Sequence, residues 1–195
     1  MDLIRHHVAG QSTGSPERTG SVYDPATGAV QAEVAFASTA ETDAAIAAAA
    51  AALPAWRATS LIKRADVFFR LRHLLVERAD ELAAIITAEH GKVLSDAKGE
   101  ISRGIENVEF AAGLVHLLKG EHAEQVSRGV DVHSVKQPVG VVAAITPFNF
   151  PVMVPLWMTA SAIACGNTVV LKPSEKDPSA ALFLAKLYEE AGLPA

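Results

Sequence analysis

The sequence predicts an α/β fold, the first part of a doubly wound parallel sheet that is preceded by helices and a small β hairpin. Two wholly apolar, β-branched runs, Val139 to Ile145 and Thr168 to Leu171, flank an apolar segment long enough for a helix. Unbroken apolar runs of this length are typical of strands buried on both faces, with helices on either side. The order strand, loop, helix, strand, loop, helix is that of a doubly wound sheet.

Composition and charge narrow the class of protein. Half of the 195 residues are hydrophobic and 20% are charged, which is ordinary for a globular chain. The net charge of -5, without a basic block, argues against a nucleic-acid surface. A single cysteine cannot form an intrachain disulfide, so we expect a cytoplasmic protein. The longest apolar stretch is too short to span a bilayer, so we expect no membrane partner.

Residues 1 to 120 are expected to hold short strands followed by helices. Ser38, three residues before Glu41, matches the capping box that begins a helix. Gly91 is a suitable stop at a helix C-terminus. The expected elements are a strand at Ala29 to Phe36 and helices from Ser38 to about Arg57, from Ser60, from Asp80 to His90 and from about Ser95 to Gly120.

Residues 121 to 137 have a different character. They are polar, with valines that alternate with charged and polar neighbours, which is typical of an exposed hairpin rather than a core strand. Farther along, Asp177 and Pro178 place a hydrogen-bond acceptor at the N-cap and proline at the first helical position. We therefore expect a last helix that runs to Glu190.

Each of the two apolar runs ends in a polar, proline-marked loop, Thr146 to Asn149 and Lys172 to Glu175. Ligands of doubly wound sheets bind at the carboxyl ends of the strands, so these loops are the candidate site. A sheet of only two strands would leave its edges uncovered. Either a partner supplies the missing strands or the chain is the N-terminal piece of a longer protein, and we favour the second.

The residues of these loops carry a resemblance to a known family. The motif TPFNFP, from Thr146, and the stretch IACGNTVVLKPSEKDPSA, from Ile163, resemble those of the aldehyde dehydrogenase superfamily, and YDPATGAV, from Tyr23, precedes them in the family's order. Within the superfamily the chain is most similar to the CoA-acylating methylmalonate-semialdehyde dehydrogenases. That similarity rests on Phe148, where most members carry tryptophan, and on Met153 to Met158.

The resemblance implies a division of the chain into three parts. Residues 138 to 195 would be the first, truncated βαβα of a Rossmann-like NAD-binding domain, and residues 1 to 120 its preceding strands and helices. Residues 121 to 137 would be part of the element through which the full-length enzyme forms a homo-oligomer, a homotetramer in this family.

The resemblance also implies a reaction. A cysteine thiolate would attack a small semialdehyde, the side-chain amide of Asn149 would stabilise the oxyanion, NAD would take the hydride and coenzyme A would accept the acyl group. In the family the nucleophilic cysteine lies in the second half of the protein, so residues 1 to 195 alone are expected to be inactive.

The resemblance assigns five residues to the cofactor. Thr146 and Phe148 would contact the nicotinamide side of NAD. Lys172, Glu175 and Lys176 would lie at the adenosine ribose. A carboxylate that accepts hydrogen bonds from ribose hydroxyls favours NAD over NADP, because it repels a 2′-phosphate.

The single cysteine and the histidines could suggest other sites, but the sequence favours simpler interpretations. Cys165, the single thiol, is interpreted as a packing residue, because free cysteines are usually buried and no base is near it in the sequence. The histidines are scattered, so no metal site is predicted. No GxGxxG fingerprint of dinucleotide-binding domains follows the first strand. Its absence favours the aldehyde dehydrogenase mode of NAD binding over that of lactate or alcohol dehydrogenases. Two alternatives stay open: a non-acylating aldehyde dehydrogenase, and a short non-catalytic protein that binds a nucleotide or a partner.

Overall fold

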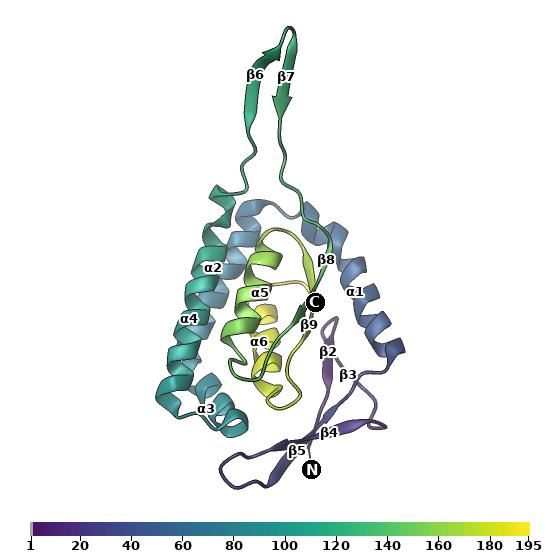
Figure 1. Ribbon diagram of the computed structural model, residues 1–195, viewed down its shortest axis with the longest axis vertical. Helices are drawn as coiled ribbons and strands as arrows, with labels where there is room; N and C mark the ends of the chain where they lie inside the picture. Colours follow the sequence, from purple (N-terminus) through teal and green to yellow (C-terminus); the bar gives the residue numbers. More distant parts are fainter. Residues whose placement is uncertain (1) are drawn as a thin grey trace.

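Two parallel strands lie between helices in the computed structural model, which describes residues 2–195 (Figure 1). Strand β8 (Val141–Ile145) pairs with β9 (Thr168–Lys172), and helix α5 (Met153–Ala164) connects them. A parallel pair needs such a crossover, because the chain must return to the starting edge. Helices α1 (Thr39–Ala58) and α5 both contact the two strands. The α/β class predicted from the two apolar runs is confirmed.

The expected burial of both strands is wrong in part. Of the five residues in β8 only Ala144 is buried, while the side chain of Ile145 is 71% exposed. The reason is that the sheet holds two strands among residues 2–195, so β8 and β9 each have one unpaired edge. Apolar runs of this kind predict a strand, but not how many neighbours cover it.

The helix boundaries at Ser38 and Gly91 lie where these capping residues predict. Ser38 and Glu41 form both halves of the capping box at α1, with Glu41 N to Ser38 Oγ at 3.2 Å and Ser38 N to Glu41 Oε2 at 2.8 Å. Gly91 ends the third helix in the left-handed region, at φ 84°. The remaining helices are α2 (Leu61–Glu77), α3 (Ala79–His90), α4 (Leu94–Gly113), the 3₁₀ turn η1 (Leu114–His116) and α6 (Ser179–Glu190).

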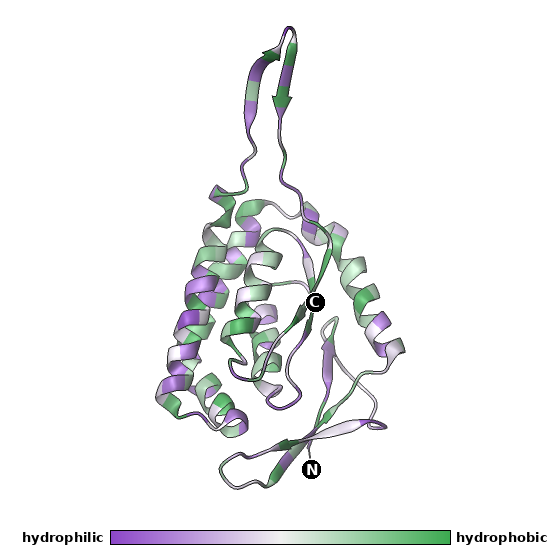
Figure 2. Cartoon of the chain, in the orientation of Figure 1, coloured by the Kyte–Doolittle hydropathy of each residue, from purple (hydrophilic) through white to green (hydrophobic). Residues whose placement is uncertain are grey.

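The helices share one hydrophobic core with the strand-connecting helix α5. Figure 2 shows α5 in pale and green shades, whereas α4 carries purple, hydrophilic residues along its outer side. Helix α4 faces this core with Ile101 and Val108, which are 1% and 0% exposed. The largest wholly buried aliphatic and aromatic side chains are Phe68, Leu71, Leu75, Leu82, Ile86, Ile101, Leu156 and Leu187.

Two predicted helix ends are wrong. Helix α4 ends at Gly113 and tightens into η1, whereas Gly120 was expected to end it. Beyond η1 the side chain of Leu117 is 54% exposed, so nothing packs there to continue the helix. At α6 the N-cap is Pro178 rather than Asp177, because Ser179 N donates to the carboxylate of Glu89 from α3 at 3.0 Å.

Short strands occupy the N-terminal part. Strand β5 (Val30–Ala35) lies between β1 (Asp2–Ile4), to which it is parallel, and β4 (Thr19–Tyr23), to which it is antiparallel. Strands β2 (His6–Val8) and β3 (Gln11–Thr13) form a separate hairpin. The strand predicted at Ala29 to Phe36 is thereby confirmed as β5.

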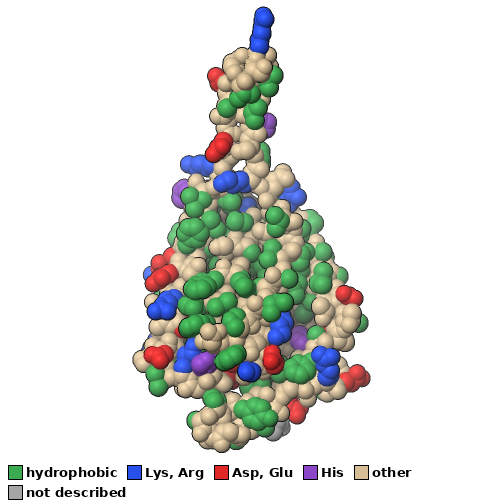
Figure 3. Space-filling model, in the orientation of Figure 1, with side chains coloured by type: hydrophobic (Ala, Val, Ile, Leu, Met, Phe, Trp, Pro, Cys, Tyr) green, Lys and Arg blue, Asp and Glu red, His purple; other side chains and the backbone are tan. Residues whose placement is uncertain are grey.

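The polar segment after α4 forms the predicted exposed hairpin. Strands β6 (His122–Ser127) and β7 (Val130–His133) are antiparallel, and every residue in them is exposed. The hairpin projects from the body as a narrow stalk (Figure 3). In residues 2–195 no single helix is long and apolar enough to cross a membrane; α1 and α2 together, bent by 114°, match a span by length and composition only.

Candidate functional site

The two predicted loops leave the sheet side by side. Thr146 N, just after β8, donates to Lys172 O at the end of β9 across 3.1 Å, so the ladder extends to the point where the loops begin. The Thr146 side chain is buried, and its Oγ1 has no hydrogen-bond partner among residues 2–195. An orphaned buried hydroxyl at the carboxyl end of a parallel strand is where a ligand of such a sheet would bind.

Phe148 joins the two loops. Its ring lies 4.2 Å from Lys176 Nζ, a cation–π contact, and 6.3 Å from the His90 ring, at an interplanar angle of 29°. Burial, and then the nearby ammonium of Lys92, lower the pKa of His90, which favours the neutral ring in this stack. Phe148 itself stays 46% exposed, so its outer face is free to form the wall of a site.

The loop after β9 presents a charged pair to solvent. Lys172 Nζ lies 3.2 Å from Glu175 Oε2, and both side chains are about half exposed. The backbone N–H of Glu175, and then Lys172, lower the pKa of the Glu175 carboxyl, so it is ionised at neutral pH and accepts hydrogen bonds. The five residues predicted to contact a cofactor therefore lie on two adjacent loops.

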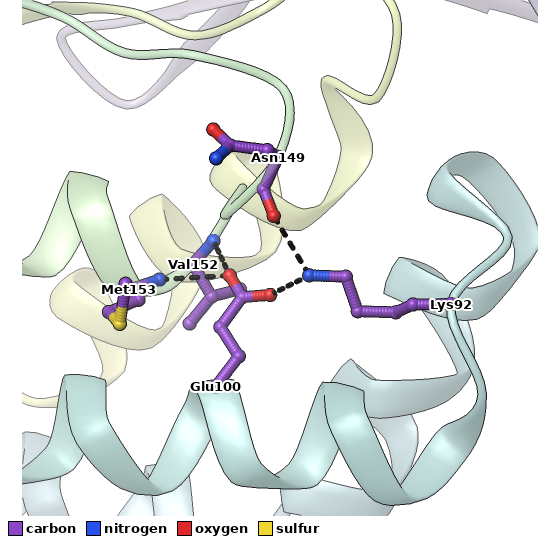
Figure 4. A network of polar contacts seen from close by, with 5 residues as sticks. All are labelled: Lys92, Glu100, Asn149, Val152 and Met153. Atoms are coloured by element: carbon purple, nitrogen blue, oxygen red, sulfur yellow. Dashed lines mark hydrogen bonds and ion pairs between the residues drawn. The ribbon is translucent and has the colours of Figure 1, made fainter.

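Asn149 is held through its backbone rather than its side chain. Lys92 Nζ donates to Asn149 O across 2.9 Å, and the same ammonium lies 2.6 Å from Glu100 Oε2 (Figure 4). Asn149 is exposed, and its amide points away from this network. The amide makes no hydrogen bond within residues 2–195, so it is free to donate to a ligand.

The Glu100 side chain also caps the N-terminus of α5. Its Oε1 accepts from Val152 N at 2.7 Å and from Met153 N at 3.1 Å, the free N–H groups at the helix N-terminus (Figure 4). A buried carboxylate is favourable there because it meets unpaired N–H groups and the positive end of the helix dipole. Neither Lys92 nor Glu100 was predicted from the sequence, since neither lies near the loops along the chain.

A further buried acid lies beside this site. Asp177 is 2% exposed, and neither of its carboxylate oxygens has a hydrogen-bond partner among residues 2–195. Burial raises the pKa of Asp177 to about 7, and the carboxylates of Glu89 and Glu100 act in the same direction. Burial likewise raises the pKa of Glu89, whose carboxylate caps α6.

Cys165 is far from the two loops. It follows the last residue of α5, whereas Asn149 precedes the first, and a helix of 12 residues is about 18 Å long. The thiol is partly buried against the core, which agrees with its interpretation as a packing residue. Two surface hollows, one lined by α1 residues and one by α2 residues with Glu190, also lie apart from the loops.

Comparison with known proteins places this site in a family. The model of the aldehyde dehydrogenase family matches residues 12–195. A malonate-semialdehyde dehydrogenase of Pseudomonas aeruginosa is 49% identical over 194 residues, which are 100% of this chain and 39% of the relative. A Dictyostelium discoideum relative, assigned as an acylating methylmalonate-semialdehyde/malonate-semialdehyde dehydrogenase, is 50% identical over 173 residues, which are 89% of this chain and 33% of the relative.

Solved structures agree with the sequence relatives. A crystal structure from Sinorhizobium meliloti 1021, assigned to methylmalonate-semialdehyde dehydrogenase and complexed with NAD, is 49% identical with a TM-score of 0.98. The alignment covers 100% of this chain and 40% of that chain. This chain thus spans between 33% and 40% of the length of these relatives. The resemblance seen in the loop motifs is confirmed, and the chain belongs to the aldehyde dehydrogenase family.

Proposed function

We propose that the chain contributes the first part of the NAD site to an aldehyde dehydrogenase that oxidises methylmalonate or malonate semialdehyde to an acyl-CoA. The observation that carries the proposal is the meeting of the two loops at the carboxyl ends of β8 and β9, with the free amide of Asn149 beside them. The relatives from Pseudomonas aeruginosa and Dictyostelium discoideum, which are named for these semialdehydes, support the substrate class.

The residues of the loops suit NAD. The ionised Glu175 carboxylate can accept hydrogen bonds from ribose hydroxyls, and Lys172 and Lys176 lie on the same loop. The orphaned Thr146 hydroxyl and the exposed Phe148 ring would form the nicotinamide side. When bound, NAD supplies the hydride acceptor, and the protein supplies orientation and electrostatics.

Asn149 would supply the oxyanion donor. Its amide is exposed, free of intrachain bonds within residues 2–195 and anchored through its backbone. A fixed donor aimed at developing negative charge is worth about 2.7–4 kcal/mol of transition-state stabilisation. The thiolate that attacks the aldehyde would come from outside these residues, because Cys165 lies at the opposite end of α5 from Asn149.

The acyl acceptor separates two candidate enzymes. The Dictyostelium discoideum relative carries the word acylating in its name, which favours coenzyme A as acceptor over water. The exposed β6–β7 hairpin, with its unpaired strand edges, suits an interface between copies, so we propose a homo-oligomer for the full-length protein. A non-catalytic binding protein is less well supported, because it would leave the free Asn149 amide without a role.

The test uses the full-length protein, NAD and a panel of semialdehydes, with and without coenzyme A. The proposal expects NADH formation with malonate or methylmalonate semialdehyde and an acyl-CoA product. Equal NADH formation without coenzyme A, with a free acid as product, would identify the non-acylating enzyme. No NADH with any aldehyde, together with no NAD binding, would refute the proposed function.

A further inference from the structure

A buried ion pair lies directly beneath the loop that carries Asn149. The side chains of Lys92 and Glu100 are 10% and 1% exposed, and their charged atoms are 2.6 Å apart. Charges removed from water are costly unless all of their bonding capacity is used. Here both carboxylate oxygens accept hydrogen bonds and the ammonium group donates two, so neither buried charge is left unpaired (Figure 4).

The pair holds both ends of one short segment. Glu100 Oε1 accepts from the N–H groups of Val152 and Met153, which fixes the first turn of α5. Lys92 Nζ donates to the carbonyl of Asn149 and also lies 4.8 Å from the centre of the Phe150 ring. Residues 149 to 153 are thus tied to the connection between α3 and α4 and to α4 itself, whose inner side belongs to the hydrophobic core.

We propose that Lys92 and Glu100 are positioning residues that set the direction of the Asn149 amide. The inference rests on the proposed function, in which that amide meets the oxyanion. The Asn149 side chain has no bond of its own within residues 2–195, so among these residues the backbone alone places the amide, by fixing the position and direction of the Cα–Cβ bond. Because a misplacement of about 1 Å can reduce a rate about a hundredfold, a tie on the adjacent carbonyl bears directly on kcat.

If the Lys92–Glu100 pair only stabilised the fold, its replacement would have a different effect. Buried ion pairs often contribute little net stability, and replacing both partners by neutral groups of similar volume can leave the fold unharmed. Removing one partner alone strands a buried charge and is strongly destabilising. The informative variant is therefore the double substitution Lys92→Met/Glu100→Gln, which keeps an amide oxygen for Val152 N but removes the donor to Asn149 O.

The first measurement compares this double variant with wild type in the full-length enzyme. We expect kcat to fall about tenfold to a hundredfold, while NAD affinity by calorimetry and the melting temperature stay close to wild type. Lys98→Met is the matched control: Lys98 lies on α4, as Glu100 does, but pairs with Asp80 of α3 at 2.8 Å in solvent, so its loss should leave kcat unchanged. Should the double variant fail to fold, Lys92→Leu/Glu100→Gln replaces it, because it likewise leaves no unpaired buried charge and no donor to Asn149 O.

The second measurement is a double-mutant cycle with Asn149→Ala. If the pair acts through the Asn149 amide, Lys92→Met/Glu100→Gln costs little further kcat once that amide is gone. The same fold-loss in both backgrounds overturns the positioning role. An unchanged kcat in the pair variant beside a large loss in Asn149→Ala also overturns it, and leaves the proposed function intact. An unchanged kcat in Asn149→Ala refutes the oxyanion role, and the positioning inference falls with it.

Discussion

Asn149 combines a bonded carbonyl with a free amide, and the proposed function gives the two groups separate tasks. In the full-length enzyme, Asn149→Ala should lower kcat about a hundredfold to a thousandfold, because one preorganised oxyanion donor is lost. NAD affinity should change little, since the proposed function assigns the amide to the oxyanion rather than to the cofactor. Steady-state kinetics measures the change in kcat, and calorimetry measures the affinity for NAD.

Asn107→Ala is the matched control for that substitution. The amide of Asn107 donates to Arg103 O on the exposed side of α4, far from the loops, so its loss should leave kcat unchanged. A loss of NAD affinity as large as the loss of kcat in Asn149→Ala would place Asn149 in cofactor binding rather than in the oxyanion site.

Asp177 makes stability depend on pH. Its native pKa of about 7 lies above the ordinary value of 3.8, so the native state binds more protons than the unfolded state between these values. Stability therefore falls by a few kcal/mol as pH rises from about 4 to about 7, and levels off above. Asp177→Asn cannot ionise, so the melting temperature of this variant should fall less between pH 5 and pH 8 than that of wild type.

Comparing Asp177→Asn with wild type isolates the Asp177 carboxyl, because Glu89 is present in both proteins. Burial also raises the pKa of Glu89. Asp80→Asn, at a side chain that is 84% exposed, should leave the pH dependence as in wild type. A variant Asp177→Asn with the full wild-type slope would show that another group is responsible.

For single residues, the sequence is informative where the residues that form a site are close together along the chain. The loop motifs were enough to nominate Thr146, Phe148 and Asn149, and the structure places all three after β8. Glu100 was not recognisable, because its partner Val152 is 52 positions away and α4 carries other acids on its surface. A buried long-range ion pair leaves no local pattern in a single sequence.

At the scale of elements, the first turn of α1 depends on Ser38. Ser38→Ala removes the acceptor for Glu41 N, and loss of such a cap costs about 1 kcal/mol. Hydrogen exchange should therefore show protection of the first turn of α1 reduced about fivefold, with the core of α2 unchanged. Ser60→Ala is the comparison: its oxygen accepts from Lys63 N at 3.5 Å, so its loss should cost less. Equal effects of the two substitutions would contradict this ranking.

Helix boundaries that are set by nearby residues were predictable, and boundaries that are set by tertiary contacts were not. Ser38 and Gly91 act within one turn, so the residues nearby are sufficient. The end of α4 is set by where packing stops, near Leu117, and the start of α6 by the carboxylate of Glu89 on another helix. Both depend on tertiary contacts that helix propensity does not encode.

At the scale of the whole molecule, the β6–β7 hairpin projects from the body, and every residue of its two strands is exposed. Glu121 and Ser134 close its base, with Ser134 N to Glu121 O at 2.9 Å. Residues 122 to 133 can therefore be replaced by Asn-Gly, which suits a two-residue turn. In the full-length protein we expect a smaller assembly by light scattering, with NAD binding and circular dichroism retained.

An Arg128→Ala substitution at the turn of the hairpin, which keeps both strands, serves as a milder control. An unchanged assembly mass after the hairpin is replaced would show that the hairpin is not part of the interface.

The hairpin was predictable because its alternation of valines with polar residues is local in the sequence. The number of strands beside β8 was not, because the two apolar runs carry no information on how many strands neighbour them.

The packing of α1 against the end of α5 has an optical consequence. The indole of Trp56 is 5% exposed and donates to Ile163 O at 2.9 Å, whereas Trp157, on α5 itself, is 46% exposed. These are the two tryptophans of the chain, and they lie in unlike surroundings. Their fluorescence is therefore separable: a soluble quencher reaches Trp157 first, and a red shift of the remaining emission reports that α1 has lifted from the body.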